Sequence, residues 1–160
     1  MTQSGADGRP LMRSTVRIEV TPGPDKLVRM PSEDAPVVMG MHDELAEFFK
    51  APPGLTPHAS TLDYVIGAVG ACLAGTFRRA LTARGVAVEP SDLQVTAVGD
   101  IVVSGDVPVI RSIEVGYVLA GARPEAEAAI ERAHAVHHRG CAVSRSLEGS
   151  IEIGTTLRLL

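Results

Sequence analysis

The chain has 160 residues, of which 45% are hydrophobic and 21% are charged. These are the proportions of an ordinary folded domain, and they exclude disordered, collagen-like and coiled-coil proteins. The formal net charge is -4 at pH 7 with no run of basic residues, which argues against nucleic acid as a partner. The longest apolar stretch, Val65 to Gly75, falls short of the ~20 residues that cross a bilayer, so we expect no membrane partner.

The N-terminal segment lacks the positive end and apolar core of a secretory signal, so we expect a cytoplasmic protein. Residues 1–15 predict a mobile tail, and residues 16–160 predict a single domain. A reducing cytoplasm disfavours a standing disulfide. Cys72 and Cys141 are therefore either buried bystanders or working thiols.

The N-terminal third of the chain predicts short strands separated by irregular segments. Residues Val16–Val20 alternate between apolar and polar, which is the period of a half-buried strand. The turn residues Pro22–Asp25 follow, so we expect a hairpin into Lys26–Met30. Further along, the pattern predicts a strand at Val37–Met41 and a short amphipathic piece at Glu44–Phe49.

The strongest periodic signal predicts a long helix in the middle of the chain. Apolar residues recur at i, i+3, i+4 and i+7 over Leu62–Leu81, and Gly85 supplies a stop. Ser60 and Asp63 have the spacing of a capping box at the start of this helix. Cys72 falls on the apolar stripe, so its thiol faces the core or an interface.

The C-terminal half predicts a hairpin, two helices and a last strand. A proline in the first turn and a glycine at the end mark the longer helix. In chain order we expect strands over Leu93–Val103 and Ile113–Leu119 around a turn at Gly105–Pro108, helices over Pro124–Val136 and Ala142–Leu147, and a strand over Ile151–Leu159. The order ββ(β)αββααβ predicts an α+β fold.

Two cysteine segments resemble those of a known family. The segment Asp63–Cys72, DYVIGAVGAC, is similar to the central helix of the OsmC/Ohr (osmotically inducible protein C, organic hydroperoxide resistance) family, which typically reads ELLxAAxGAC. The segment Cys141–Leu147, CAVSRSL, is similar to the second cysteine motif of the family, CPVSxxL. The order of elements agrees from Val16 to Leu160. Ala142 stands where the family has proline, and Asp63 where it has glutamate.

The resemblance implies an OsmC-like fold, with antiparallel sheets wrapped around the long central helix in an intertwined homodimer. It implies a thiol-dependent peroxidase that reduces organic hydroperoxides in oxidative stress defence, without a cofactor. In that role Cys72 is the peroxidatic cysteine, Cys141 is the resolving cysteine, and Asp63 takes the position of the family's carboxylate. The helix also carries small residues that suit close packing: Gly67, Ala68, Gly70 and Ala71.

The chemistry of two thiols can be stated from the residues alone. A thiolate that attacks a peroxide becomes a sulfenic acid, which a second thiol converts to a disulfide that an external dithiol reduces. Burial raises a cysteine pKa, so a cation from outside the helix must reach Cys72. Family members use an arginine, held by a carboxylate, from the N-terminal strands, and the candidates here are Arg13, Arg17 and Arg29. Asp63 lies about 13.5 Å along the helix from Cys72, so it can act only across a dimer.

Two other functions stay open. The first is a non-catalytic domain of the same fold, with inert thiols, that binds an apolar ligand or partner. The second is a metal-binding protein, because the sequence contains the spacing HxxHHxxC: His134, His137, His138 and Cys141. His134 and His138 share a helix face, and Cys141 adds a sulfur ligand. A polar helix end, where histidine complements the helix dipole, is the simpler interpretation of these histidines.

Overall fold

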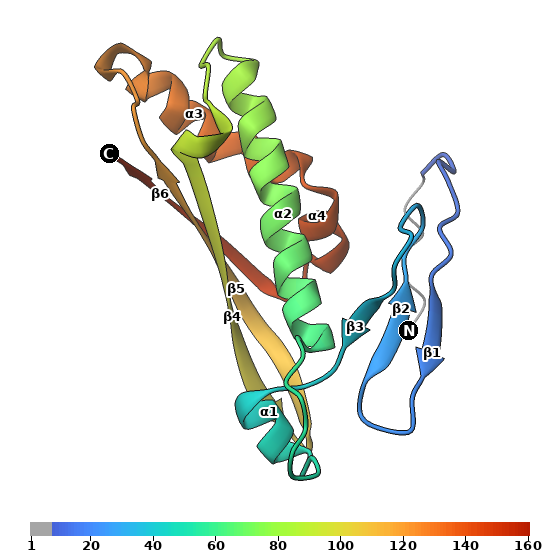
Figure 1. Ribbon diagram of the computed structural model, residues 1–160. Helices are drawn as coiled ribbons and strands as arrows, with labels where there is room; N and C mark the ends of the chain where they lie inside the picture. The colour runs from blue at the N-terminus through green and yellow to red at the C-terminus, as the bar shows by residue number, and fades with distance from the viewer. Residues whose placement is uncertain (1–7) are drawn as a thin grey trace. The chain divides into compact units, whose positions relative to one another are not determined.

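The structure, a computed structural model, describes residues 8–160. It divides into two compact units, an N-terminal one that ends at Ser60 and a C-terminal one that begins at Thr61. Each unit contains a three-stranded sheet (Figure 1). Together with the helices, these sheets confirm the predicted α+β class. Residues 1–7 of the predicted tail lie outside the described residues. The tail and the single domain over 16–160 stay predictions.

The N-terminal unit contains an antiparallel sheet in the order β1-β2-β3, with β1 over Arg17–Val20, β2 over Lys26–Arg29 and β3 over Val37–Met39. The predicted hairpin is therefore confirmed. The short helix α1, Asp43–Phe48, follows β3. Two neighbouring aromatic rings at its end, Phe48 and Phe49, are exposed.

A close approach of side chains requires glycine directly after β3. A Cβ atom at position 40 would collide with the Asp25 carboxylate and lie 2.9 Å from the His58 Cβ. Nδ1 of His58 lies 3.2 Å from Oδ2 of Asp25, so the two side chains meet beside Gly40. The backbone of Gly40 also bridges that of Ser60. These contacts join the three-stranded sheet to His58 and Ser60, the last residues of the N-terminal unit.

The C-terminal unit begins with α2, Thr61–Thr82, which confirms the predicted long helix. Its buried face carries Leu73, Phe77 and Leu81. The helix is followed by Gly85 at φ +72°, a conformation that favours glycine and closes the end of a helix. Two further helices are α3, Glu127–His137, and α4, Ala142–Leu147. Three 3₁₀ turns are η1, Pro90–Asp92, η2, Pro124–Ala126, and η3, His138–Gly140.

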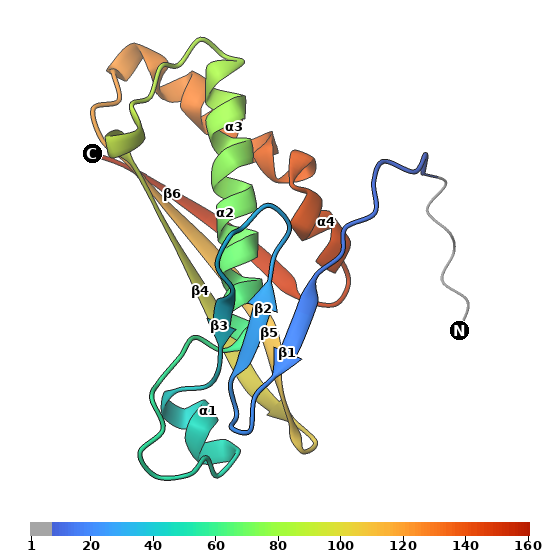
Figure 2. The same cartoon turned by 45° about the vertical axis from the view of Figure 1, so that its right-hand side comes forward.

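The sheet of the C-terminal unit has the order β4-β5-β6, with β4 over Leu93–Ser104, β5 over Val107–Leu119 and β6 over Glu152–Leu159. β4 and β5 form an antiparallel hairpin, but β6 lies parallel to β5. The expectation of antiparallel sheets is therefore wrong for β6, which reaches β5 through the helices α3 and α4 rather than through a turn. Figure 2 shows the tip of the hairpin extending beyond the first turn of α2. Apolar side chains near this tip are exposed: Val98, Ile101, Val103, Val107 and Val109.

The turn between β4 and β5 is shorter than the sequence predicts, and β5 begins at Val107 rather than Ile113. Gly105 has φ +62°, which lets the chain reverse within two residues. Pro108 looked like part of the turn, but it pairs with Val103 inside the hairpin. β6 pairs with β5 only from Ser112 onward. The missing N–H of Pro108 therefore interrupts no ladder on the β6 side.

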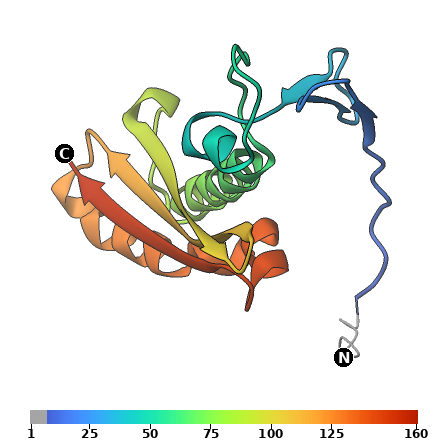
Figure 3. The ribbon, with the colours of Figure 1, turned by 90° about the horizontal axis from the view of Figure 1, so that it is seen from below.

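The main core lies between the sheet and the helices of the C-terminal unit. Figure 3 shows α2 and α3 on the same face of this sheet. Alternate residues of β5 point toward the helices and are fully or almost fully buried: Ile113, Val115, Tyr117 and Leu119. Ile130 and Ala133 of α3 and the buried face of α2 complete this cluster. Each large apolar side chain in it contributes roughly 1.5–3 kcal/mol of burial free energy.

Within the described residues, no helix has the length and apolar character that a membrane crossing requires.

Candidate thiol site

The structure brings Cys72 and Cys141 together inside the C-terminal unit. Cys72 lies in the middle of α2, and Cys141 lies between η3 and the first residue of α4. Both are free thiols, and their side chains are hydrogen-bonded to each other. Cys141 is 0% exposed, whereas Cys72 keeps part of its surface accessible. The pair therefore has one fully buried cysteine and one partly exposed cysteine.

Cys141 caps the N-terminus of α4 with its sulfur. The backbone N–H of Ser144 donates to Sγ of Cys141 at 3.4 Å, and the Ser144 hydroxyl donates to the same sulfur at 3.1 Å. Burial raises the pKa of Cys141, but hydrogen bonds from Cys72, from Ser144 and from the Val143 N–H outweigh it. The pKa of Cys141 consequently lies below its ordinary value, as expected for a thiol at the start of a helix.

The pKa of Cys72 is shifted in the opposite direction, above its ordinary value. Burial raises its pKa, and the hydrogen bond to Cys141 and the charge of that sulfur raise it further. The backbone N–H groups of Ala142 and Val143 oppose this effect only in part. Within the C-terminal unit Cys141 is therefore the stronger acid. Cys72 requires a cation from elsewhere to become the thiolate, which agrees with the requirement derived from its place in the helix.

A buried hydrogen-bonded pair, Tyr117 and His137, lies close to Cys141. Nδ1 of His137 is 2.6 Å from the carbonyl oxygen of His134, and Nε2 of His137 is 2.9 Å from the Tyr117 hydroxyl. A carbonyl oxygen only accepts, so Nδ1 carries the proton, Nε2 accepts, and Tyr117 donates. Burial raises the pKa of Tyr117, and the charge of Cys141 raises it further. This pair joins β5 to the last turn of α3, just ahead of Cys141.

The histidines do not assemble into a metal site. Within residues 8–160, no group of three or more His, Cys, Asp or Glu side chains is placed to hold a metal ion. The ring of His134 stacks on that of His137 at 5.3 Å, and both contact Phe77. The interpretation of the histidines as a polar helix end is wrong for His137, which is 3% exposed. Its polar atoms instead find partners inside the core.

Acidification is expected to destabilise the fold through His137. Burial lowers the pKa of His137 below the ordinary 6.5, so the folded chain binds fewer protons than the unfolded chain. The contribution is complete above about pH 6.5 and declines as the pH falls below that value. Urea unfolding at about pH 7.5 and about pH 5 should show the loss, and His137→Gln should reduce it. The exposed His138 is the control: its charge is the weakest of the effects on the pKa of His137, so His138→Gln should change the loss much less than His137→Gln does. An equal loss in His137→Gln and the native chain would contradict this account.

Asp63 lies away from the two thiols within this unit. It lines a shallow groove of about 410 Å³ between α2 and β4, together with Gly67, Gly70 and Ala97. Cys72 is not among the lining residues of this groove and contacts α4 instead. The carboxylate and the thiols thus occupy different surroundings of the same helix.

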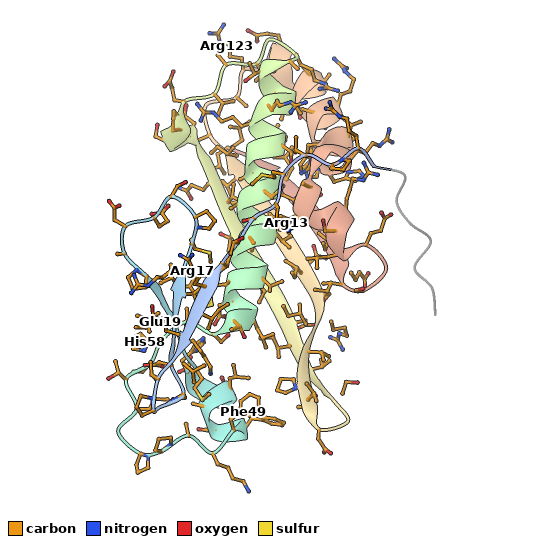
Figure 4. The ribbon with its side chains drawn as sticks, turned by 90° about the vertical axis from the view of Figure 1, so that its right-hand side faces the viewer. Arg13, Arg17, Glu19, Phe49, His58 and Arg123 are labelled. Carbon is orange, nitrogen blue, oxygen red and sulfur yellow. The ribbon has the colours of Figure 1, made fainter. Side chains whose placement is uncertain are left out.

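The three candidate arginines belong to the N-terminal unit. Nε of Arg29 lies 2.7 Å from Oε1 of Glu19, and Arg17 lies directly opposite Arg29 in the β1–β2 register. Figure 4 shows Arg17 and Glu19 on β1 and Arg13 ahead of that strand. An arginine held by a carboxylate is what the resemblance implies. The carboxylate that holds Arg29 is Glu19, which the sequence analysis did not single out.

Sequence reasoning also missed the role of Ser144. The signal was present, because a hydroxyl three residues after an N-cap position can reach the cap. The pairing of Tyr117 with His137 had no comparable local signal, since the two residues belong to different elements.

Comparisons with known proteins agree with this architecture. The family model described as OsmC-like protein matches residues 54–156. An organic hydroperoxide resistance protein from Elizabethkingia anophelis is 16% identical with a TM-score of 0.68, over 96% of this chain and 100% of that chain. OhrB, the organic hydroperoxide resistance protein of Bacillus subtilis, is 12% identical with a TM-score of 0.65, over 93% and 100%.

An OsmC-like protein of unknown function from Vibrio cholerae is 12% identical with a TM-score of 0.72, over 92% of this chain and 100% of that chain. No curated protein matches the chain significantly. At these identities the structural likeness shows the shared fold.

Proposed function

Because the chain belongs to the OsmC-like protein family, we propose that it is a cysteine-based peroxidase that reduces organic hydroperoxides. The hydrogen-bonded pair of Cys72 and Cys141 carries this proposal. Two thiols in contact are the minimum set for peroxide reduction followed by disulfide formation. The names of the Elizabethkingia and Bacillus proteins point to organic hydroperoxides as the substrate class.

In the first step, the Cys72 thiolate attacks the distal oxygen of the hydroperoxide. The O–O bond breaks, Cys72 becomes a sulfenic acid, and the alkoxide leaves with the electron pair. The neighbouring thiol of Cys141 supplies the proton that converts the alkoxide to an alcohol. The substrate gains two electrons and Cys72 loses two.

In the second step, the resulting Cys141 thiolate attacks the sulfenic sulfur of Cys72. A disulfide bond forms, hydroxide leaves, and a proton from solvent converts it to water. Ser144 holds the Cys141 sulfur with its hydroxyl and its N–H, so the nucleophile of this step is already placed. An external dithiol then restores both thiols.

Activation of Cys72 is assigned to an arginine of the N-terminal unit, in a homodimer with two such sites. Arg29 is favoured by its ion pair with Glu19, and Arg13 and Arg17 remain the alternatives. The exposed apolar tip of the β4–β5 hairpin and the groove beside Asp63 support a second copy as the partner. In such a dimer Asp63 takes the role of the family's carboxylate.

The test is a thiol count after one equivalent of cumene hydroperoxide. The native chain should lose both thiols and the mass of two hydrogen atoms, and dithiothreitol should restore them. Hydrogen peroxide at the same concentration provides the comparison for substrate class. The raised pKa of Cys72 favours the alternative of an inert binding domain. If both thiols survive excess hydroperoxide, that alternative replaces the peroxidase.

A further inference from the structure

The two sulfurs of the pair differ in their access to an external thiol. Cys141 is 0% exposed and belongs to the main core cluster, whereas Cys72 is only partly buried. Thiol–disulfide exchange requires the attacking sulfur to reach one of the two disulfide sulfurs directly. Attack on Cys141 would require the start of α4 to move. Within the C-terminal unit, attack on Cys72 requires no movement of α4.

The two sulfurs also differ in how well the protein holds them as leaving groups. The Ser144 hydroxyl lies 3.1 Å from Sγ of Cys141, and the Ser144 N–H lies 3.4 Å from it. Both groups donate, so negative charge that develops on this sulfur is met by donors already in place. A disulfide breaks faster when the departing sulfur is the better stabilised thiolate. Access and leaving-group stabilisation therefore favour the same direction of attack.

We infer that the external dithiol attacks the Cys72 sulfur, and that Cys141 departs as a thiolate held by Ser144. This inference rests on the proposed function, because it concerns the disulfide that the proposed reaction forms. Ser144 acts as a positioning residue through Cys141.

The atoms and electrons of this reduction balance. One thiolate of the dithiol forms a bond to the Cys72 sulfur, the Cys72–Cys141 bond breaks, and its electron pair goes to Cys141. The second thiolate of the dithiol then attacks the dithiol's own sulfur in the mixed disulfide and releases Cys72. The dithiol loses two electrons and becomes a disulfide. Its two protons pass, through solvent, to the two protein thiols.

The direction of attack can be mapped without any peroxidase activity. Diamide first forms the disulfide in the native chain, and 2-mercaptoethanol then reacts briefly before an acid quench and alkylation with N-ethylmaleimide. Trypsin separates the two cysteines into the peptides 51–78 and 140–145. We expect the mercaptoethanol adduct on Cys72 and the maleimide on Cys141. The reverse pattern overturns the inference, and so does the absence of a disulfide after diamide.

The role of Ser144 is tested by Ser144→Ala with Ser146→Ala as the matched control. The Ser146 hydroxyl donates to the Ala142 carbonyl at 2.9 Å and belongs to the same helix, so its loss perturbs α4 without touching a sulfur. Ser144→Ala should slow reduction by dithiothreitol about tenfold, because a hydrogen bond to a charged group is lost. Ser146→Ala should reduce at the native rate. Equal rates for all three chains would overturn the role of Ser144.

A pH titration separates a positioning role from a structural one. The ultraviolet absorbance of the thiolate, followed in the Cys72→Ser background, reports Cys141 alone. Ser144→Ala should move its midpoint to higher pH, and Ser146→Ala should not. Because diamide replaces the hydroperoxide throughout, failure of the proposed peroxidase and failure of this inference are recorded by different measurements.

Discussion

Cys72→Ser is expected to abolish the reaction of the chain with an organic hydroperoxide, and Cys141→Ser is expected to preserve the first step. The difference follows from the order of the two attacks, since Cys141 acts only on a sulfenic acid that already exists. In Cys141→Ser the oxidised Cys72 has no partner thiol and persists as a sulfenic acid. Intact mass should show one added oxygen, and dimedone should trap it on the peptide that contains Cys72.

The acidity of the two thiols makes this pair of variants decisive. In the C-terminal unit the pKa of Cys141 is lowered and that of Cys72 is raised, so the arginine of the N-terminal unit has to reverse the order. A dimedone adduct on Cys141 in the Cys72→Ser chain would show that no such reversal occurs. The two cysteines would then exchange their proposed roles. Each variant serves as the control for the other, because both remove one sulfur from the same contact.

Elements with a strong local pattern were predictable from the sequence. The apolar stripe of α2 and the glycine at its end gave nearly the observed bounds, because burial of one helix face imposes a period close to 3.6 residues. The start of β5 was not predictable in this way. Pro108 is a breaker in most strands, and only the register of β6 shows why it is tolerated at this position.

The sequence predicted which residues form the candidate site, but it predicted only part of how they are arranged in space. Both cysteines came from motifs, whereas the hydrogen bonds that Ser144 donates to Cys141 came from the structure. The pairing of Tyr117 with His137 depends on β5 and α3 packing together, which no local spacing encodes. Local spacing also does not distinguish Arg29 from Arg17. The two residues lie opposite each other in the β1–β2 hairpin and carry the same charge. Tertiary contacts, rather than propensities, distinguish these residues.

Phe77→Ala is expected to lower the free energy of unfolding by about 3–5 kcal/mol, which is the range for deleting a buried aromatic ring. Phe77 is 0% exposed, and its ring centroid lies 4.7 Å from that of Tyr117 and 5.2 Å from that of His137. The deletion leaves a cavity beside the Tyr117–His137 pair. Urea unfolding followed by circular dichroism measures the loss.

Phe49→Ala is the matched control for Phe77→Ala, since it deletes the same ring from a position that is 53% exposed. Its cost should stay near 0.5 kcal/mol or below, roughly the range for surface substitutions. Phe77 also supports the last turn of α3 ahead of Cys141, through Tyr117 and His137. Disulfide formation by diamide should therefore slow in Phe77→Ala at urea concentrations where the chain is still folded. If Phe77→Ala lowers the stability but leaves the rate of disulfide formation unchanged, Phe77 does not support the thiol site. If Phe77→Ala and Phe49→Ala lose the same free energy of unfolding, the argument from burial is wrong.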